Sequence, residues 1–321
     1  LGRCCARQGD AAKAESYFKD ALDLLDQVGF PRYADQTARR FSFHHLCQSG
    51  RFIQARQYRE ERVRGDSLSK LRIIHHFACT GGTVISKCIA SMRNTAVISE
   101  LHPFNIGGVH FNPVDPMQVI LASGQIRIDQ SDKKTLFRER LDAVLEACEQ
   151  NGKTCVLRDH THSDYCLGRR EEITHRAVLS SLPDRSTVQS LVTVREPIDS
   201  YASMCQYGWQ KGVGSFDEYC YRYLLFLDDY VDAEVIKYED FCDSPEAIMR
   251  KICSILDIEF NPNFLDVFSS VQLTGDSGRG RSMTRISPLP EKDHSAELLS
   301  EAEQSENYNV LKNILGYSKG Q

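Results

Sequence analysis

The chain has 321 residues, enough for one complete α/β core and a smaller additional segment. Its formal net charge is -5, which argues against a broad nucleic-acid-binding surface but leaves room for a local basic pocket. No apolar run approaches the roughly 20 residues of a transmembrane helix. We therefore expect no nucleic-acid partner and no membrane span in this sequence.

The chain contains 12 cysteines, and none of them belongs to a CxxC pair. A zinc site or a disulfide framework would need regular cysteine spacings, which are missing here. Several cysteines instead fall on apolar stripes, among them Cys88, Cys148 and Cys253. We expect reduced thiols in the core, no metal site and a location in the cytoplasm.

Residues 1–65 are predicted to form two helical hairpins, the second over about 34–62. A glycine break and small or aromatic residues at helical spacing mark the first hairpin. These positions are Leu1, Gly2, Gly9, Ala14, Phe18 and Ala21. Their spacing resembles a tetratricopeptide repeat that is entered partway through. Because such repeats stack on neighbours, we expect further repeats before Leu1 and a surface that could recruit a protein partner.

Residues 71–321 are predicted to form an α/β domain. Apolar runs of strand length alternate with helical patterns, which predicts a parallel sheet with helices on both faces. The predicted strands are 71–77, 95–99, 154–157, 189–194 and 233–238, and the predicted helices are about 84–92, 133–151, 197–204, 216–230, 245–257 and 295–316. The expected fold is a P-loop-like three-layer sandwich with a central parallel sheet, preceded by a small all-α helical-hairpin segment.

A glycine turn joins the first predicted strand to its helix, where residues 80–83 read Thr-Gly-Gly-Thr. Such a turn presents backbone N–H groups and the positive end of a helix dipole, an arrangement that commonly binds phosphate. The same sequence is also compatible with a βα turn that needs glycine only for steric reasons.

Polar residues follow the carboxyl ends of the other predicted strands, where ligands of parallel sheets bind. They are Glu100, His160, Arg195 and Tyr238, and we expect them to lie near the glycine turn. Eight residues after Arg195 comes Ser203, on the helix predicted to follow that strand. A multi-donor cation with a hydroxyl suits a phosphate monoester, and the alternative is an ion pair at the sheet edge.

The order of these motifs resembles that of sulfotransferases that use PAPS (3′-phosphoadenosine 5′-phosphosulfate). The likeness covers about residues 71–286. The motifs that carry it are the glycine turn, Arg195 with Ser203, the VIKYEDF run at 235–241, and Pro245 at a helix start. The resemblance implies in-line transfer of a sulfuryl group to a hydroxyl or amine acceptor, with 3′,5′-ADP as product and without a metal.

The resemblance also implies roles for individual residues. The 5′-phosphosulfate would be cradled by the residues of the glycine turn, Thr80, Gly81, Gly82 and Thr83. Arg195 and Ser203 would bind the 3′-phosphate, and Tyr238 would lie near the adenine. A late basic loop would close over the nucleotide, with Arg279 or Arg281 reaching the 3′-phosphate.

The sequence departs from this family at Cys79, where a lysine or arginine usually precedes the turn. A cation there would offset the charge that builds on the bridging oxygen as the sulfuryl group leaves. The candidates to replace it are Lys87, Arg158, His75 and His76. The sequence does not choose among them.

Sulfuryl transfer needs a base that takes the proton from the acceptor. In the tyrosylprotein branch of the family a carboxylate at the spacing of Glu100 is the base. In the cytosolic branch a strand-end histidine is placed like His160. Both residues stay candidates, and their structural alternatives are a capping or salt-bridging carboxylate and a surface histidine.

Two other functions stay open. A P-loop kinase would share the strand–turn–helix architecture, although the Walker spacing G-x-x-x-x-G-K-[ST] is missing. A nucleotide-binding scaffold, with the helical hairpins recruiting a partner, would fit the cysteine at position 79. The expected acceptor loops are 102–131, 161–185 and 205–216. Their His, Tyr, Gln and Trp209 side chains could suit a carbohydrate, a peptide tyrosine or a small phenolic molecule.

Overall fold

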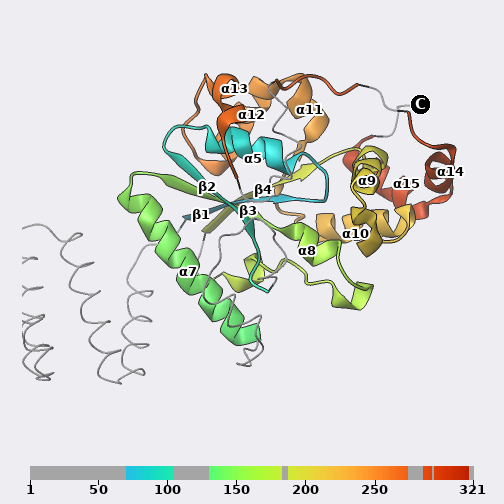
Figure 1. Cartoon of the computed structure of the whole chain (residues 1–321), viewed down its shortest axis with the longest axis horizontal. Coiled ribbons are helices and arrows are strands. Elements are labelled where there is room, and N and C mark those ends of the chain that lie inside the picture. Colours follow the sequence, from blue (N-terminus) through green and yellow to red (C-terminus); the bar gives the residue numbers. More distant parts are fainter. Residues whose placement is uncertain (1–69, 105–129, 183–186, 274–284, 291–292, 318–321) are drawn as a thin grey trace, which may run out of the picture. The chain divides into compact units, whose positions relative to one another are not determined.

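The computed structural model describes residues 70–104, 130–182, 187–273, 285–290 and 293–317 (Figure 1). The helical hairpins predicted for residues 1–65, and the basic loop residues Arg279 and Arg281, lie outside this part of the chain. Within the described ranges, no helix combines the length and apolar character that crossing a bilayer requires.

Five parallel strands form one sheet in the order β2-β3-β1-β4-β5. They are β1 (Lys70–His76), β2 (Thr95–Leu101), β3 (Thr154–Asp159), β4 (Thr187–Val194) and β5 (Glu234–Lys237). Every pairing is parallel, which confirms the predicted sheet. Because β2 and β3 lie on one side of β1 and β4 and β5 on the other, the strand order reverses at β1. The carboxyl end of β1 is therefore the expected place for a ligand.

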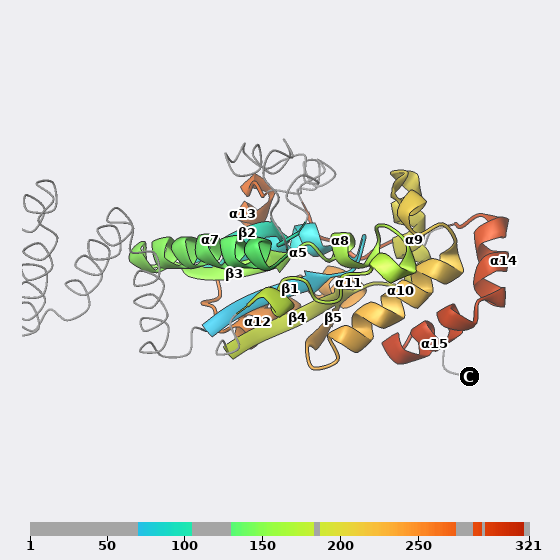
Figure 2. The same cartoon turned by 90° about the horizontal axis from the view of Figure 1, so that it is seen from below.

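Consecutive residues of β1 point to opposite faces of the sheet. Ile74 packs in a cluster with α5 (Gly82–Ala90) and α12 (Pro245–Leu256). The neighbouring Ile73 packs in a separate cluster with α7 (Gln130–Gln150). Helices thus cover both faces of the sheet, and the predicted three-layer α/β fold is confirmed for the described residues (Figures 1 and 2).

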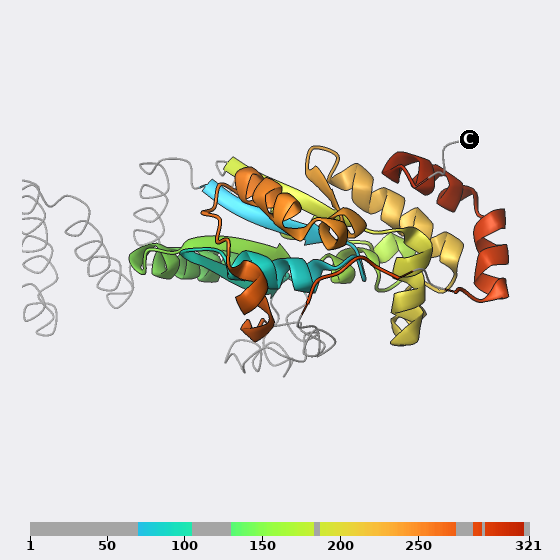
Figure 3. The same ribbon diagram turned by 90° about the horizontal axis from the view of Figure 1, so that it is seen from above.

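Some of the remaining helices lie at the carboxyl ends of the strands. The complete set of remaining helices in the described residues is α8 (Thr161–Tyr165), α9 (Pro197–Gln206), α10 (Phe216–Asp229), α11 (Tyr238–Asp243), α13 (Phe264–Val267), α14 (Ala296–Gln304), α15 (Glu306–Leu315), and the short 3-10 helices η1 (Arg170–Glu172), η2 (Leu179–Ser181), η3 (Trp209–Gly212) and η4 (Phe268–Ser270). Figures 2 and 3 show α9, α10, α14 and α15 together at one end of the molecule. Aromatic residues of α10, such as Tyr223, stack on Phe77 just after β1.

Several predicted boundaries are wrong by a few residues. Strand β3 continues to Asp159 instead of ending at Leu157, so Arg158 belongs to the sheet. The single helix predicted for 295–316 is two helices, because Ser305 accepts the Tyr308 N–H and so caps a new helix. These shifts matter for the site, since they fix which strand residues reach its edge.

Candidate active site

The glycine turn after β1 has two residues in the left-handed backbone region. Cys79 and Gly81 have φ angles of 64° and 82°, a conformation that glycine adopts without strain. The Thr80 hydroxyl donates a 2.8 Å hydrogen bond to the Phe77 carbonyl and lies 3.1 Å from Thr193 Oγ1. Because the Thr80 side chain is fully buried, its hydroxyl serves the turn and leaves ligand contacts to the backbone.

Gly81 and Gly82 let two aromatic rings approach the turn closely. A Cβ atom at Gly81 would lie 2.1 Å from Cδ2 of Tyr238, and one at Gly82 would lie 2.4 Å from Cδ2 of His76. Helix α5 then begins, and its first turn carries no acidic residue. The steric role of the glycines and the anion-binding character of the helix start therefore occur together.

Arg195 follows β4 and is buried with few partners. Its side chain is 8% exposed, yet Nη2 lies 3.4 Å from Asp199 Oδ2 and Nη1 lies 3.5 Å from the Cys79 carbonyl. Among the described residues, its Nε has no hydrogen-bond partner. Hydrogen bonds between the Tyr223 hydroxyl and the Arg195 main chain hold this position. A buried guanidinium with long contacts is ready to take an anion.

Tyr238 lies beside both the glycine turn and Arg195. Its ring contacts Gly81, and the Arg195 guanidinium lies 5.5 Å from the ring centroid. The residue begins α11 instead of ending β5, and burial raises its pKa, so the phenol stays protonated. Ser203 is half-buried on α9, the helix after Arg195. One aromatic ring thus lies next to both the glycine turn and Arg195.

Glu100, Arg158 and His160 form a second cluster, at the ends of β2 and β3. Glu100 is 8% exposed and has a φ angle of 61°, rare for a residue with a side chain. Its Oε1 lies 2.7 Å from Arg158 Nη1, and its Oε2 lies 3.1 Å from His160 Nε2. The two predicted base candidates are therefore direct neighbours on one carboxylate.

Arg158 also reaches the glycine turn. Its Nη2 donates to Thr83 Oγ1 and lies close to His76 Nε2, both at 3.0 Å, while Nη1 donates to Ser99 Oγ at 3.0 Å. The strand register makes this possible, because Arg158 pairs with Ile74 in the central strand. Arg158 is one of the candidates to replace the cation missing at position 79. It carries a permanent charge, and a hydrogen bond holds it against the turn.

Burial sets the protonation of this cluster. Burial raises the pKa of Glu100, and nearby Asp159 adds to this, whereas Arg158 opposes it. Burial lowers the pKa of His160 to about 4, with further lowering from His102 and Arg158. At neutral pH the imidazole is therefore neutral, and the fixed charge beside Glu100 is the Arg158 guanidinium.

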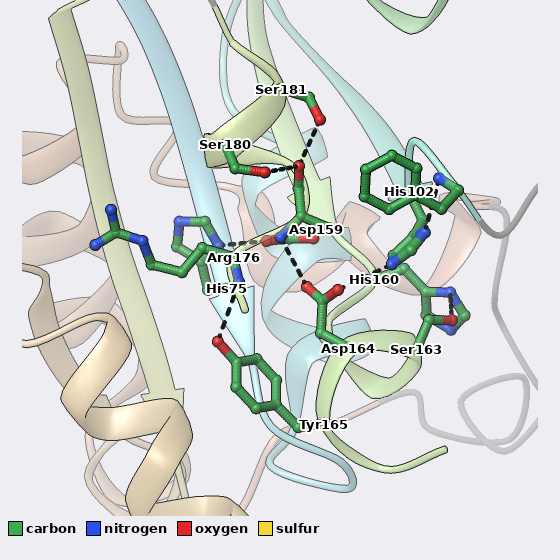
Figure 4. Close-up of polar contacts among 12 residues, drawn as sticks. His75, His102, Asp159, His160, Ser163, Asp164, Tyr165, Arg176, Ser180 and Ser181 are labelled. Atoms are coloured by element: carbon green, nitrogen blue, oxygen red, sulfur yellow. Dashed lines mark hydrogen bonds and ion pairs between the residues drawn. The ribbon is translucent and has the colours of Figure 1, made fainter. Parts of the chain in front are cut away.

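A set of buried acids and histidines supports the ends of β2 and β3 (Figure 4). His160 Nδ1 lies 2.9 Å from Ser163 Oγ, and His102 Nε2 lies 3.0 Å from Asp164 Oδ1. The His102 Nδ1 accepts the Phe104 N–H, so its Nε2 carries the proton and donates to Asp164.

Asp159 is fully buried on the other side of β3. Its Oδ2 lies 2.8 Å from His75 Nδ1 and accepts a 3.1 Å hydrogen bond from the Tyr230 hydroxyl. The sequence motifs did not assign Ser99, His102 or Asp159 to the site. The sequence feature that could have identified these residues was their position at strand ends, next to Glu100 and His160.

Aromatic side chains continue from His160 toward the surface. The rings of His160 and His162 are 6.1 Å apart, and His162 is 6.1 Å from Trp209. Trp209 and Tyr207 are 40% and 41% exposed, with their rings 5.7 Å apart. These residues belong to two of the three predicted acceptor loops. Of the third, 102–131, residues 105–129 lie outside the described part of the chain, and 130–131 belong to the start of α7 instead of a loop.

Lys87, another catalytic candidate, lies buried on α5, one turn after Thr83. Arg158 is the cation that contacts both Thr83 and Glu100. Arg279 and Arg281 stay predictions, because they lie outside the described residues. Among those that are described, no cluster of His, Cys, Asp or Glu could hold a metal ion.

No protein-family model matches the sequence, and no curated protein matches it. Solved structures similar to this chain include a sulfotransferase domain from the curacin biosynthetic pathway, at 16% identity and a TM-score of 0.45, covering 79% of this chain and 100% of that one. A sulfotransferase domain of the Synechococcus PCC 7002 olefin synthase has 12% identity and a TM-score of 0.45, covering 79% and 97%. A sulfotransferase from Alicyclobacillus acidocaldarius has 12% identity and a TM-score of 0.41, covering 77% and 96%. At this level of likeness, a function for this chain has to be argued from its own site residues.

Proposed function

We propose that this chain is a PAPS-dependent sulfotransferase that moves a sulfuryl group to a hydroxyl or amine acceptor and leaves 3′,5′-ADP. The observation that carries the proposal is the buried, weakly paired Arg195 guanidinium beside Tyr238, with the glycine turn next to the same ring. Two candidate anion-binding groups beside one aromatic ring suit a nucleotide with charged groups at both its 3′ and 5′ positions.

In this proposal the amides of Gly81, Gly82 and Thr83, at the start of α5, bind the 5′-phosphosulfate. Arg195 and Ser203 bind the 3′-phosphate. The ring of Tyr238 lies near the adenine, and Arg279 or Arg281 closes over the nucleotide. A P-loop kinase would need only the first of these groups, so it gives no reason for a buried arginine beside Tyr238.

Glu100 is the better candidate for the base. Both ring nitrogens of His160 are occupied, by Glu100 and by Ser163. A carboxylate has about four acceptor sites, so Glu100 can hold Arg158 and His160 and still accept a proton. Its raised pKa also makes it a stronger base than an ordinary carboxylate. His160 would then orient the carboxylate.

The transfer would proceed by in-line displacement at sulfur. Glu100 takes the acceptor proton while the acceptor oxygen or nitrogen forms its bond to sulfur. The bond between sulfur and the bridging oxygen breaks, and that oxygen leaves with 3′,5′-ADP. Arg158, held on Thr83, would offset the charge that grows on the leaving oxygen, the role that a residue at position 79 usually has in the family.

The proposal is tested by incubating the full chain with radiolabelled PAPS and a panel of phenols, sugars and tyrosyl peptides. Label transfer to an acceptor, lost in Glu100→Gln, supports it. Binding of nucleotide without transfer to any acceptor would instead support the scaffold, with residues 1–65 recruiting a partner. Turnover of ATP without PAPS would support the kinase.

A further inference from the structure

His294 lies on the far side of Asp199 from Arg195. Its Nε2 is 3.1 Å from Asp199 Oδ1, and Asp199 Oδ2 is 3.4 Å from Arg195 Nη2. The His294 and Asp199 side chains are only 14% and 19% exposed. One carboxylate therefore bridges an imidazole and the guanidinium that the proposed function assigns to the 3′-phosphate.

We propose that His294 is a specificity-determining residue for this 3′-phosphate, and that phosphate binding at Arg195 is coupled to uptake of a proton by His294. This inference rests on the proposed function, because it concerns the same anion site. It adds a residue from the C-terminal part of the chain, more than 90 residues after Arg195.

The need for such a residue comes from Asp199. A carboxylate next to Arg195 repels an incoming phosphate dianion. Asp199 lies in the first turn of α9, at the positive end of the helix dipole. Its main-chain N–H is held by Glu196 Oε2 at 2.9 Å, which fixes its place. The negative charge must therefore be offset by a neighbour.

His294 is in position to offset it. Imidazole is the side chain whose charge changes most readily near neutral pH. The residue is held by the start of α14, where the adjacent Ser295 accepts the Leu298 N–H at 3.3 Å. A protonated His294 would neutralise Asp199 and leave the Arg195 charge available to the ligand.

The other charged groups that line the pocket around His294 are carboxylates. His294 shares this pocket between α9 and α14 with three further carboxylates and two neutral groups. The carboxylates are Asp293, Glu297 and Glu301, and the neutral groups are Tyr201 and Cys205. Burial raises the pKa of both Tyr201 and Cys205, so they stay uncharged. Among the described residues, the cation nearest to this pair is Arg195, which contacts the other oxygen of Asp199.

The coupling should be seen only with ligands that carry a 3′-phosphate. The 5′ group would bind at the start of α5, beside Gly81 and Tyr238, and its ligands would be backbone amides and not Arg195. We therefore compare 3′,5′-ADP with 5′-AMP by calorimetry at pH 7.5, where a phosphate with a second pKa of about 6 is already mostly a dianion. Titrations in two buffers with different ionisation enthalpies give the number of protons taken up.

The variants are His294→Gln, Asp199→Asn and the double variant. His175→Gln is the matched control, because His175 forms a similar pair with Asp229 at 2.6 Å, away from this site. We expect proton uptake with 3′,5′-ADP and none with 5′-AMP. His294→Gln should abolish the uptake and weaken 3′,5′-ADP about tenfold, as expected for loss of a charged partner. When Asp199→Asn is already present, adding His294→Gln should cause no further loss of 3′,5′-ADP affinity.

Binding of 3′,5′-ADP without proton uptake would overturn the inference and leave the proposed function standing. Equal affinities of wild type and His294→Gln for 3′,5′-ADP would do the same. Unchanged 5′-AMP binding shows that a variant is folded. If His294→Gln does not fold, Asp199→Asn tests the coupling independently. Failure of the wild type to bind 3′,5′-ADP would reject the proposed function itself, and the inference with it.

Discussion

Arg158 donates a 3.0 Å hydrogen bond to Thr83 Oγ1 and so connects strand β3 to the glycine turn. The same guanidinium forms a 2.7 Å ion pair with Glu100. One buried cation thus contacts both the glycine turn and Glu100, the candidate base. In the proposed function, Arg158 would supply the positive charge at the leaving oxygen that a chain with a cysteine at position 79 otherwise lacks.

The first prediction concerns the buried pair of Arg158 and Glu100. Arg158→Met should lower the free energy of unfolding by about 3 to 5 kcal/mol, because it leaves the carboxylate buried without its partner. Glu100→Gln in the same chain should recover part of the loss, since the amide carries no charge. Urea unfolding measures both.

The matched control for this pair is Arg250→Met, which removes an exposed arginine paired with Glu246 at 2.8 Å. It should change the stability by less than about 1 kcal/mol. If Arg158→Met is equally mild, Arg158 is not the buried partner described here.

The second prediction concerns the contact between Gly81 and Tyr238. Gly81→Ala should destabilise the protein and abolish nucleotide binding, because its Cβ would lie 2.1 Å from the Tyr238 ring. Gly152→Ala is the control, since Gly152 also has a positive φ of 64° but no described atom within 4 Å of the position that a Cβ would take. That variant should lose only about 1 kcal/mol, from backbone strain.

The Gly81→Ala effect should be partly relieved by Tyr238→Ala, which removes the clash. Thermal unfolding of the single and double variants measures this coupling. Purely additive effects would mean that the two residues do not touch.

The third prediction concerns acid stability. Burial lowers the pKa of His160 and of His162 to about 4, compared with about 6.5 in an unfolded chain. Between these values the unfolded state binds more protons, so stability is fully present above pH 6.5 and falls as pH drops toward 4. Glu100 acts in the opposite direction, because its raised pKa favours the protonated folded form as the pH falls.

The test is to measure the free energy of unfolding at pH 7 and at pH 5. His162→Gln should make the difference smaller than in the wild type, and Glu100→Gln should make it larger. A difference that His162→Gln does not alter would show that this histidine is not buried in its neutral form.

Much of the sheet could be predicted from sequence, because each strand is a short apolar run followed by a polar residue. Leu71 to Phe77 and the two glycines after it specify the β1 turn by pattern alone. The strand ends also placed Glu100, His160 and Arg195 at one edge. That inference used only the rule that parallel strands share a carboxyl end.

The contacts within the site could not be predicted in the same way. The meeting of Glu100 and His160 depends on a register shift between β2 and β3, between Ile98 and Leu101, and on the positive φ of Glu100. The choice of Arg158 over Lys87 depends on its pairing with Ile74 across the sheet. The His294 contact joins two segments far apart in the chain. Such long-range geometry leaves no local sequence signal.

The central claim is that Arg195 binds a 3′-phosphate, and calorimetry of Arg195→Ala tests it most directly. We predict that the variant binds 3′,5′-ADP about 100-fold more weakly than the wild type, as for loss of hydrogen bonds to a charged group, and binds 5′-AMP almost unchanged. Arg250→Ala, at an exposed arginine, should bind both ligands as the wild type does. Equal losses for 3′,5′-ADP and 5′-AMP in Arg195→Ala, or no binding of 3′,5′-ADP by the wild type, would contradict the account.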